Sequence, residues 1–494
     1  MPSLDLPEPP SIEASHLRRR SASAPRLESF SLALKTFTPI LGGGPVARSP
    51  ELPSVDIIRV PTMRGHLRFW WRALYGHAYV MRGASGAEEL ALRERQLWGG
   101  MGRASKVKGP TGAPEGAVRS LVELRVTEVQ PAGADTGKID LGAPPAYALW
   151  PARNGKEEAD VPRWKPGLRF NLEVTAPEGD AMAQVRNAVR AWILFGGYGS
   201  RGRRGCGSVC LEPSAPDIAQ WLPASADRAS LRRLFGDVPL FAPELAEHPC
   251  DMPLLRGAHL LRGDANTRQR DGEKAWLAAL GWLRDFRQGT QPVFSGSADL
   301  LGVARSPGEG KRAGRSNWPE ADKIRRFARP SRQSRRAGNA YPDVHAPRPQ
   351  HSATPAWPRA GFGLPIVFHF QQKRREGGDY QPKEPDDVQL QWARQVGTRW
   401  EQMDRLASPL IVKALPLADG RFEPIALWLE RGTPSGGHVV MTQFKESDPR
   451  TRVPFARAFR AQDDQPLFKS LQRADNLRDA FFLWLKETRK AQEA

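Results

Sequence analysis

The chain has 494 residues, 40% of them hydrophobic, so it is long enough for two or three domains with buried cores. Its 73 lysines and arginines exceed its acids by 19, which favours a polyanionic partner, because clustered cations release the counterions that condense on phosphates. The sequence contains no run of about 20 apolar residues, which a membrane-spanning helix would need, so no membrane partner is expected. Three cysteines (Cys206, Cys210 and Cys250) make no disulfide framework, and the sequence therefore predicts a protein of the reducing cytoplasm.

The first half of the chain predicts a regular succession of strands and helices. Residues 1–27 are rich in Pro, Ser and Arg and lack the apolar stretch of a signal peptide, so we expect a disordered basic arm there. The elements predicted next are a strand at 29–37, helices at 61–80 and 87–97, a glycine-rich loop at 99–116, strands at 118–129, 147–150 and 168–176, a helix at 180–195 and a strand at 207–212. A ferredoxin-like α+β domain requires this order, here at 28–212 with 130–166 as an inserted arm.

The second half of the chain is less regular. A linker rich in Pro and Ala at 213–227 precedes it, and residues 305–359 are dense in Arg, Pro and Ser. The elements predicted around that segment are an amphipathic helix at 272–287, a strand at 363–371, a hairpin at 409–430 and a closing helix at 465–493. The hairpin turns at Asp419 and Gly420, the residue pair expected of a tight turn. We therefore expect a second α+β domain over 228–494.

The strongest candidate for chemistry is the segment Gly196–Ser208, GGYGSRGRRGCGS, which we name the glycine–arginine loop. Glycines let a backbone approach phosphate closely and expose consecutive N–H groups, and arginines add bidentate donors for phosphate oxygens. The alternative is an exposed flexible loop, but three arginines beside six glycines cost stability with no packing return. No Gly-Lys-Ser/Thr ending is present, so this is not a Walker loop. The residues predicted to bind RNA here are Gly196, Gly197, Gly199, Arg201, Arg203, Arg204, Gly205 and Gly207.

Three arginines on the helix predicted at 61–80 form a second candidate. Their spacing of i, i+4 and i+8 puts them on one side of that helix, while apolar side chains turn inward on the other. Like charges at this spacing repel, so a bound anion explains them better than a solvated face, and the start of a helix also favours an anion. The arginines are Arg64, Arg68 and Arg72, preceded by Arg59, and the inward side chains are Phe69, Trp70 and Leu74.

Residues 305–336 are a third candidate, with eleven cations and three acids, a net charge of +8. A charge run is usually a solvated tail. Trp318 and Phe327 are interleaved here, however, and Tyr341 follows, which suits base stacking or docking on a ribonucleoprotein. Both interpretations stay open. The arginines singled out in this segment are Arg315, Arg325 and Arg326.

Signals for metal binding and catalysis are weak. Cys206 and Cys210 are separated by three residues without a second pair, so we expect no zinc site, and no cofactor motif is present. His66 lies beside the arginine helix and is a candidate base for RNA cleavage. A lone histidine on a basic helix is more often a phosphate or surface contact, and the sequence therefore predicts a protein that is not an enzyme.

Several stretches resemble the RAMP superfamily, and specifically the first-numbered subunit family of the type III-B CRISPR Cmr effector complex. They are RVPTMRGHLRFWWRAL at Arg59–Leu74, WILFGGYGSRGRRGCGS at Trp192–Ser208, GRSNWPEADKIR at Gly314–Arg325, and Arg359–Phe370 together with Arg405–Leu415. They span most of the chain in the family's order, and the first two are quite specific to this family. The resemblance implies two tandem ferredoxin-like, RRM-like RAMP domains with inserted loops and arms.

The resemblance also implies a non-catalytic RNA-binding subunit, which contacts the crRNA 3′ region and target RNA beside other Cmr RAMP subunits. As in Cas9-type effectors, base pairing is expected to recognise the RNA sequence, and the protein is expected to recognise the backbone and shape of the RNA. Two other hypotheses stay open. One is a crRNA-processing endoribonuclease of the same superfamily, for which His66 is the candidate base. The other is a ribosomal or general RNA chaperone.

Overall fold

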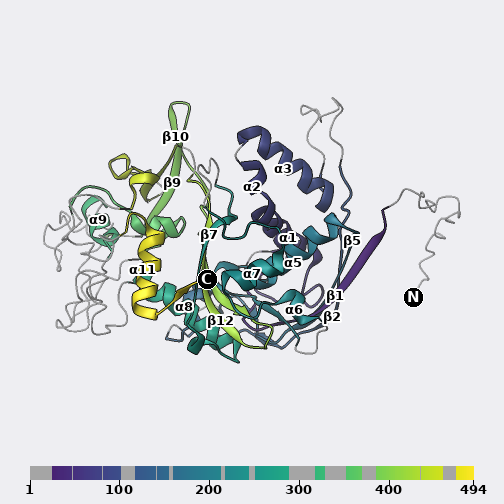
Figure 1. The fold of residues 1–494 in the computed structure, drawn as a ribbon. Helices are drawn as coiled ribbons and strands as arrows, with labels where there is room; N and C mark the ends of the chain where they lie inside the picture. Colours follow the sequence, from purple (N-terminus) through teal and green to yellow (C-terminus); the bar gives the residue numbers. More distant parts are fainter. Residues whose placement is uncertain are drawn as a thin grey trace, which may run out of the picture.

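The computed structural model describes residues 25–46, 48–80, 82–101, 117–140, 142–154, 159–212, 217–243, 251–288, 318–328, 352–369, 385, 387–433, 436–444, 446–459 and 474–494. The prediction of an α+β protein is confirmed, because helices alternate with antiparallel sheets over these residues (Figure 1). Among them, no helix is both long and apolar enough to cross a membrane.

The first half is built on an antiparallel sheet of four strands in the order β2-β5-β1-β6. The strands are β1 (Leu27–Thr36), β2 (Glu123–Gln130), β5 (Arg169–Pro177) and β6 (Val209–Leu211). Helix α1 (Val60–Tyr75) follows β1, and helix α5 (Asp180–Phe195) joins β5 to β6. Chain order is thus strand, helix, two strands, helix, strand, as the sequence predicts for this half.

The second half repeats this scheme of connections. Its four-stranded sheet has the order β11-β12-β7-β16, also antiparallel. The strands are β7 (Leu254–Arg262), β11 (Leu410–Pro416), β12 (Phe422–Glu430) and β16 (Gln492–Glu493), and the helices are α8 (Gly272–Gln288) and α11 (Leu477–Arg489). In chain order β7, β11, β12 and β16 correspond to β1, β2, β5 and β6, so each strand has the same neighbours in the two sheets.

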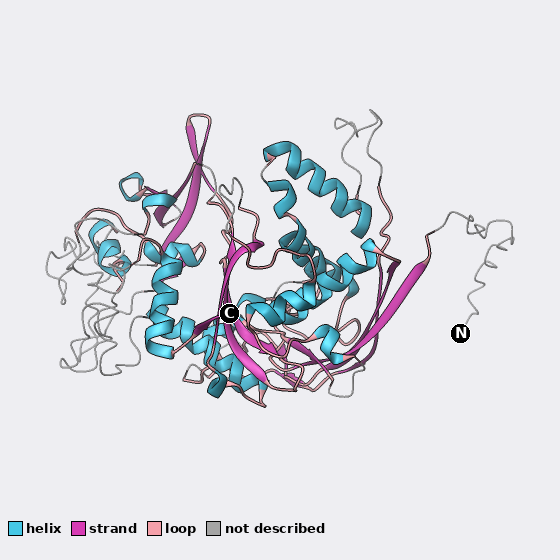
Figure 2. Ribbon diagram, in the orientation of Figure 1, coloured by secondary structure: helices cyan, strands magenta, loops and turns pink. Residues whose placement is uncertain are grey.

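The two halves pack together through two hydrophobic clusters that meet at β11. Side chains of β11 alternate between two hydrophobic clusters: Ile411 and Leu415 pack in the cluster that holds α1 and α5, whereas Val412 and Ala414 pack in the cluster of α8 and α11. Helices of the first half therefore cover one face of the second sheet, and helices of the second half cover the other. The molecule has alternating layers of sheet, helices, sheet and helices, which run from right to left in Figures 1 and 2.

A further sheet is inserted into the second half. It contains β8 (Ile366–Phe368), β9 (Val388–Val396), β10 (Arg399–Gln402), β13 (Gly437–Gln443), β14 (Glu446–Ser447) and β15 (Val453–Pro454). Helix α9 (Glu320–Phe327) contributes Ile324 to the separate hydrophobic cluster of this sheet. The β9–β10 hairpin extends away from the rest of the molecule (Figure 1).

The remaining elements are short, apart from one helix. They are α2 (His77–Val80), α3 (Gly83–Trp98), β3 (Ala134–Asp135), α4 (Ala146–Leu149), β4 (Arg163–Trp164), α6 (Ile218–Trp221) and α7 (Arg228–Phe235). Short turns of 3-10 helix lie at Trp150–Ala152, Gly202–Arg204, Ala265–Thr267, Pro358–Phe362, Pro449–Thr451 and Phe455–Arg457.

Several expected boundaries change. The strand predicted at 147–150 is wrong: these residues form α4 and the turn after it, because Pro145 begins a helical turn and a short apolar run does not distinguish strand from helix. The helix predicted to reach Val80 ends at Tyr75, where Gly76 follows. The last helix ends at Arg489, and the residues after it form β16. The basic arm up to residue 24, loop residues 102–116 and most of 305–351, Arg315 and Tyr341 included, lie outside the described residues.

Candidate nucleic-acid interface

The glycine–arginine loop connects α5 to β6, and its glycines allow it to pack tightly upon itself. Gly199, Gly205 and Gly207 have φ values of +83°, +77° and +65°, the left-handed region that side chains rarely adopt. A Cβ atom at Gly207 would lie 1.9 Å from the carbonyl oxygen of Tyr198, and one at Gly205 would lie 2.4 Å from the ring of Trp276. These glycines are therefore required for packing inside the protein.

Many backbone N–H groups of the loop already have acceptors within the protein. Tyr198 N–H donates to the Gly207 carbonyl at 2.8 Å, and Gly207 N–H donates to the Pro39 carbonyl at the same distance. Ser200 N–H reaches the Leu41 carbonyl at 2.7 Å, and Ser208 N–H reaches Thr38 Oγ1 at 2.8 Å. For these groups the expected exposed anion nest is wrong, since one bond closes the loop on itself and the others hold it against the chain that follows β1.

The three arginines of the loop donate to carbonyl oxygens elsewhere in the protein. Arg204 is only 6% exposed and reaches the Leu410 carbonyl at 3.1 Å. Arg203 donates to the Ser408 carbonyl, and Arg201 Nε donates to the Ala148 carbonyl at 3.1 Å. The expectation that these arginines bring no packing return is therefore wrong: they join the loop to the second half and to the 130–166 arm.

Burial affects the electrostatics of these arginines. It lowers the pKa of Arg204 to about 9 and that of Arg203 to about 10, and it lowers the pKa of Arg201 as well. Arg204 is enclosed, so in this structure it is closed to a phosphate. Arg201 and Arg203 are half-buried and still reach the surface. Arg201 and Arg203 therefore remain candidate RNA-binding residues of the loop.

Helix α1 has the two faces that its sequence predicts. Trp70 and Leu74 are 3% and 0% exposed and lie in the core, Phe69 is half-buried, and the arginines lie on the other side. Arg68 Nε is 2.6 Å from Glu94 Oε1, and Arg72 contacts the same oxygen. Glu94 comes from α3 and is 6% exposed, so an internal acid balances part of the like charge that a bound anion was expected to explain.

Arg64 and Arg59 differ in their contacts. Arg64 donates to Ser120 Oγ at 2.6 Å and to the Val122 carbonyl at 3.1 Å, which ties α1 to the segment before β2. Burial, followed by the charge of Arg68, lowers the pKa of Arg64. Arg59 is half-exposed, and over the described residues its side chain has no recorded hydrogen bond or ion pair. Arg59 is thus the most available of the four arginines of this region.

His66 contacts the glycine–arginine loop. Its Nε2 accepts the N–H of Gly199 at 3.3 Å, and its ring meets Tyr198 edge-on with 6.0 Å between ring centres. Burial lowers the pKa of His66, which favours the neutral ring that accepts this bond. The nitrogen that a general base would use is therefore occupied within the protein.

Lys413 is a functional candidate that the sequence analysis missed. It is 0% exposed in the middle of β11, and its Nζ donates to the carbonyls of Ile193 and Gly196 at 2.9 and 2.7 Å. These carbonyls lie at the end of α5, where helix carbonyls lack internal partners and the helix dipole favours a cation. Burial lowers the pKa of Lys413 to about 7. A single lysine within the apolar run PLIVKALPL was the signal that could have identified it.

Only residues 318–328 of the arginine-rich segment are described, and they are partly structural. Trp318 is 3% exposed and its Nε1 donates to the Phe286 carbonyl at 3.0 Å, so the base-stacking interpretation does not apply to this residue. Buried Glu320 pairs with Arg359 at 3.1 Å. Arg325 and Arg326 lie in α9, in its last turn. Within the ranges that the structure describes, no group of three or more His, Cys, Asp or Glu side chains could hold a metal ion.

Comparisons with known proteins relate part of this chain to a family. Residues 33–210 match the family model described as the RAMP superfamily. The CRISPR system Cmr subunit Cmr1-1 of Pyrococcus furiosus is 25% identical over 199 residues, which are 39% of this chain and 50% of that protein. The chain thus matches about half the length of this curated relative.

Solved structures are more distant. The crystal structure of Cmr1 from Pyrococcus furiosus in its apo form has a TM-score of 0.37 and 15% identity, and the match covers 83% of this chain and 89% of that one. A chain of the cryo-EM structure of the type III-B Cmr-beta bound to cognate target RNA has a TM-score of 0.35 and 10% identity, with 83% and 97% covered. Because both TM-scores are below 0.5, the fold rests on the strand order and packing described above.

Proposed function

We propose that the protein is a non-catalytic, RNA-binding subunit of a type III-B Cmr ribonucleoprotein, from the premise that residues 33–210 match the RAMP superfamily. Its partners would be crRNA, target RNA and other Cmr RAMP subunits, in the cytoplasm. The observation that carries the proposal is the glycine–arginine loop of this domain, because Arg201 and Arg203 reach the surface there while the described residues supply them with carbonyl acceptors and no carboxylate.

The charge distribution supports an RNA partner. A net charge of +19 favours phosphate at long range, and guanidinium groups bound only to neutral carbonyls keep their full charge for an anion. Arg59 adds a further half-exposed cation near the loop, since its backbone N–H donates to the hydroxyl of Tyr198 at 2.8 Å. An acidic protein partner is less favoured, because RNA offers regularly spaced phosphates to arginines that lie on separate elements.

The contacts of His66 support the non-catalytic part of the proposal. An endoribonuclease of this superfamily would need a base beside a 2′-hydroxyl group, and His66 is the candidate from the sequence. Its Nε2 instead accepts a backbone N–H of the loop. We propose that His66 positions the glycine–arginine loop, and we expect His66→Ala to leave cleavage of target RNA by the assembled complex within a few-fold of wild type.

We further propose that residues 28–212 and 228–494 are two ferredoxin-like domains, joined by 213–227. The repeated strand orders β2-β5-β1-β6 and β11-β12-β7-β16 support this division. Because helices of the first unit cover the second sheet, the two would act as one rigid body, which is what a subunit that reads the shape of RNA needs.

The test is purification of the tagged chain from its host, followed by sequencing of the bound RNA and mass spectrometry of the bound proteins. We expect short RNAs that carry a repeat-derived 5′ tag, together with other RAMP subunits. A protein that purifies alone, or with ribosomal RNA, contradicts the proposal and favours the RNA chaperone. Cleavage of repeat RNA by the isolated protein, lost in His66→Ala, favours the endoribonuclease.

A further inference from the structure

Two arginines from distant parts of the chain donate to the loop at 405–409, and this loop begins with a third arginine. Arg203 of the glycine–arginine loop donates to the carbonyl of Ser408. Arg431, just after β12, donates to the carbonyl of Ala407. Arg405 begins the 405–409 loop itself and is exposed. Side chains that are distant in sequence thus place their charge around one short segment.

No carboxylate within the described residues pairs with any of these three arginines at ion-pair distance. Burial and the neighbouring charge of Arg203 lower the pKa of Arg431 to about 10, with a smaller opposing effect of Asp251. Arg203 also lies over the ring of Phe69, 5.8 Å from its centre, which adds no negative charge. Like charges held together by neutral carbonyls repel, so an anion bound between them would stabilise the arrangement.

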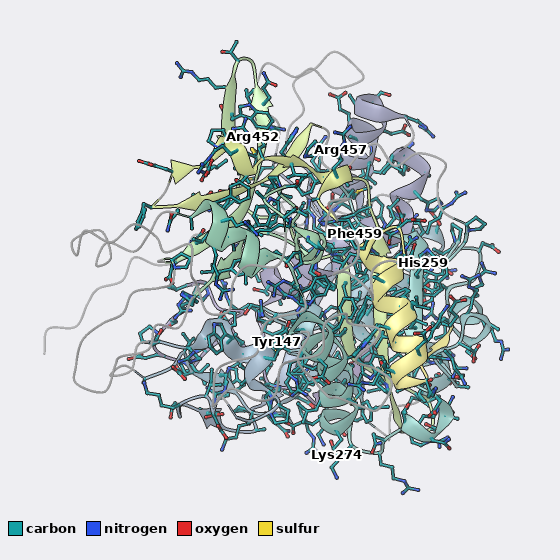
Figure 3. The ribbon with its side chains drawn as sticks, turned by 90° about the vertical axis from the view of Figure 1, so that its left-hand side faces the viewer. Tyr147, His259, Lys274, Arg452, Arg457 and Phe459 are labelled. Atoms are coloured by element: carbon teal, nitrogen blue, oxygen red, sulfur yellow. The ribbon has the colours of Figure 1, made fainter. Side chains whose placement is uncertain are left out.

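A groove of about 410 Å³ adjoins this cluster. The 405–409 loop forms one wall with Leu406 and Pro409, and Arg431 lines the groove as well. Aromatic side chains line other parts: Trp428 from β12 and Phe459 are half-buried. Figure 3 shows Phe459 close to the start of α11, with Arg457 beyond it. The volume lies in the range of about 300–1,000 Å³ found for small-molecule sites.

The ring of Trp428 in the groove is held by neighbouring rings. Trp428 lies 6.0 Å from Phe362 and 6.4 Å from Phe482 between ring centres, so neighbours on two sides fix its orientation. A polar pair, Glu430 and Arg478 at 3.8 Å, also lines the groove and can meet the polar edge of a base. Fixed aromatic faces beside arginines are the combination with which proteins bind splayed bases of single-stranded RNA.

We propose that this groove is a subsite for one unstacked base of single-stranded RNA, with Arg203, Arg405 and Arg431 on the adjoining phosphates. The inference rests on the proposed RNA-binding function and adds a defined position to it. A chain of RNA would run from the glycine–arginine loop over the 405–409 loop, and one base would turn into the groove. RNA binding at the groove requires a base, whereas the rest of the charged surface contacts the phosphate backbone of the RNA.

The test uses the full chain and a single-stranded RNA whose nucleotides are replaced one at a time by abasic residues. Stacking of a base on an aromatic side chain is worth about 5- to 150-fold in affinity. We therefore expect one abasic position in the RNA to weaken binding by a factor in this range, measured by fluorescence anisotropy at fixed salt, while other positions have little effect.

Two variants tie that position to the groove. Thr433 is exposed on the groove wall, so Thr433→Trp should fill the groove, remove the sensitivity to the abasic residue and weaken binding of intact RNA by the same factor. Phe459→Leu keeps an apolar side chain without a ring face and should reduce the sensitivity in part. The matched control is Asn266→Trp, at an exposed residue far from the groove. Asn266 follows Arg262, which pairs with Ile425 near the start of β12, whereas the groove lies at the end of β12.

The outcomes separate the subsite from the proposed function. If the wild-type chain and the assembled complex bind no RNA, the proposed function fails and the subsite with it. If RNA binds and the abasic profile is the same in wild type and Thr433→Trp, the subsite is wrong while the function stands. If Thr433→Trp blocks assembly with other subunits but keeps the wild-type abasic profile, the groove is a protein-docking site and the subsite is likewise overturned.

Discussion

The two four-stranded sheets share one connection scheme but lie in different surroundings. Strand β1 alternates along its length, with Ser29 and Ser31 exposed and Leu32 and Leu34 buried. Every residue of β11 is buried, because helices cover both of its faces. The difference shows that a repeated topology can serve two purposes: the first sheet supports helices on one side, and the second joins the helices of both halves.

The open face of the first sheet also bears on how RNA would be held. Apart from Leu27 at the start of β1, its outward positions are polar or small, and they include Ser29, Ser31, Ala33 and Lys35 on β1, Asn171, Glu173 and Thr175 on β5, and Arg125 and Thr127 on β2. RRM sheets stack bases on aromatic side chains of this face. Because no aromatic ring is present at these positions, we expect the proposed RNA binding at the loops and the joint between the halves.

The largest effect is expected from a charge placed in the doubly covered sheet. Ile411 is 2% exposed between β11 and the helices of the first half, so Ile411→Asp buries a carboxylate without a partner. This should cost several kcal/mol, a large part of a typical stability, and leave the protein unfolded or insoluble. Ser31→Asp on the open face is the control and should stay within about 0.5 kcal/mol. Chemical denaturation compares them; a stable Ile411→Asp protein contradicts the layered arrangement.

A smaller loss of stability is expected at the joint. Substitution of Arg201, Arg203 and Arg204 by Ala removes donors to three carbonyls and should lower the free energy of unfolding by about 1–3 kcal/mol. The exposed pair of Arg125 with Glu173, at 3.8 Å on the open face, is the comparison, and Arg125→Ala should change stability by at most about 1 kcal/mol. Equal melting temperatures for the triple variant and wild type would mean that the loop does not join the halves.

A pH-dependent effect is expected from Lys413. Because burial lowers its pKa to about 7 from 10.5, the unfolded chain binds a proton between these values that the folded chain lacks, so this lysine makes stability rise with pH in that window. The slope is at most about 1.4 kcal/mol per pH unit. The difference in unfolding free energy between wild type and Lys413→Met should therefore move in favour of wild type from pH 7 to pH 9. Lys486→Met, at an exposed lysine, is the control for the replacement itself.

The smallest effect is expected for RNA binding at the open face. Ser31→Asp adds a negative charge to the middle of the first sheet, and if RNA lies on the loops and the joint, its affinity for single-stranded RNA should stay within about two-fold of wild type. Anisotropy titrations at two salt concentrations measure this. A loss of more than ten-fold would show that the sheet face holds RNA as an RRM sheet does, and the contrast between the two sheets would then need revision.

Local patterns along the chain were enough to predict much of this protein. Alternating and helical periodicity predicted β1, α1, α5 and the β11–β12 hairpin, because each depends on neighbours in sequence. Trp70 and Leu74 were assigned to the inner face of α1 for the same reason. The amino-acid composition likewise gave the basic charge, and two motifs in the first half led to the RAMP resemblance, which residues 33–210 bear out.

Tertiary structure alone decided the surroundings of the charged residues. Arg204 looked available in a glycine-rich loop, but the second sheet encloses it, and Glu94, remote from Arg68 in sequence, turned a like-charged stripe into an ion pair. Lys413 acquired its role only when β11 packed against the end of α5. Whether a charge meets water, a carbonyl or an acid depends on contacts between distant segments, because burial and pairing, unlike periodicity, are properties of the packed chain.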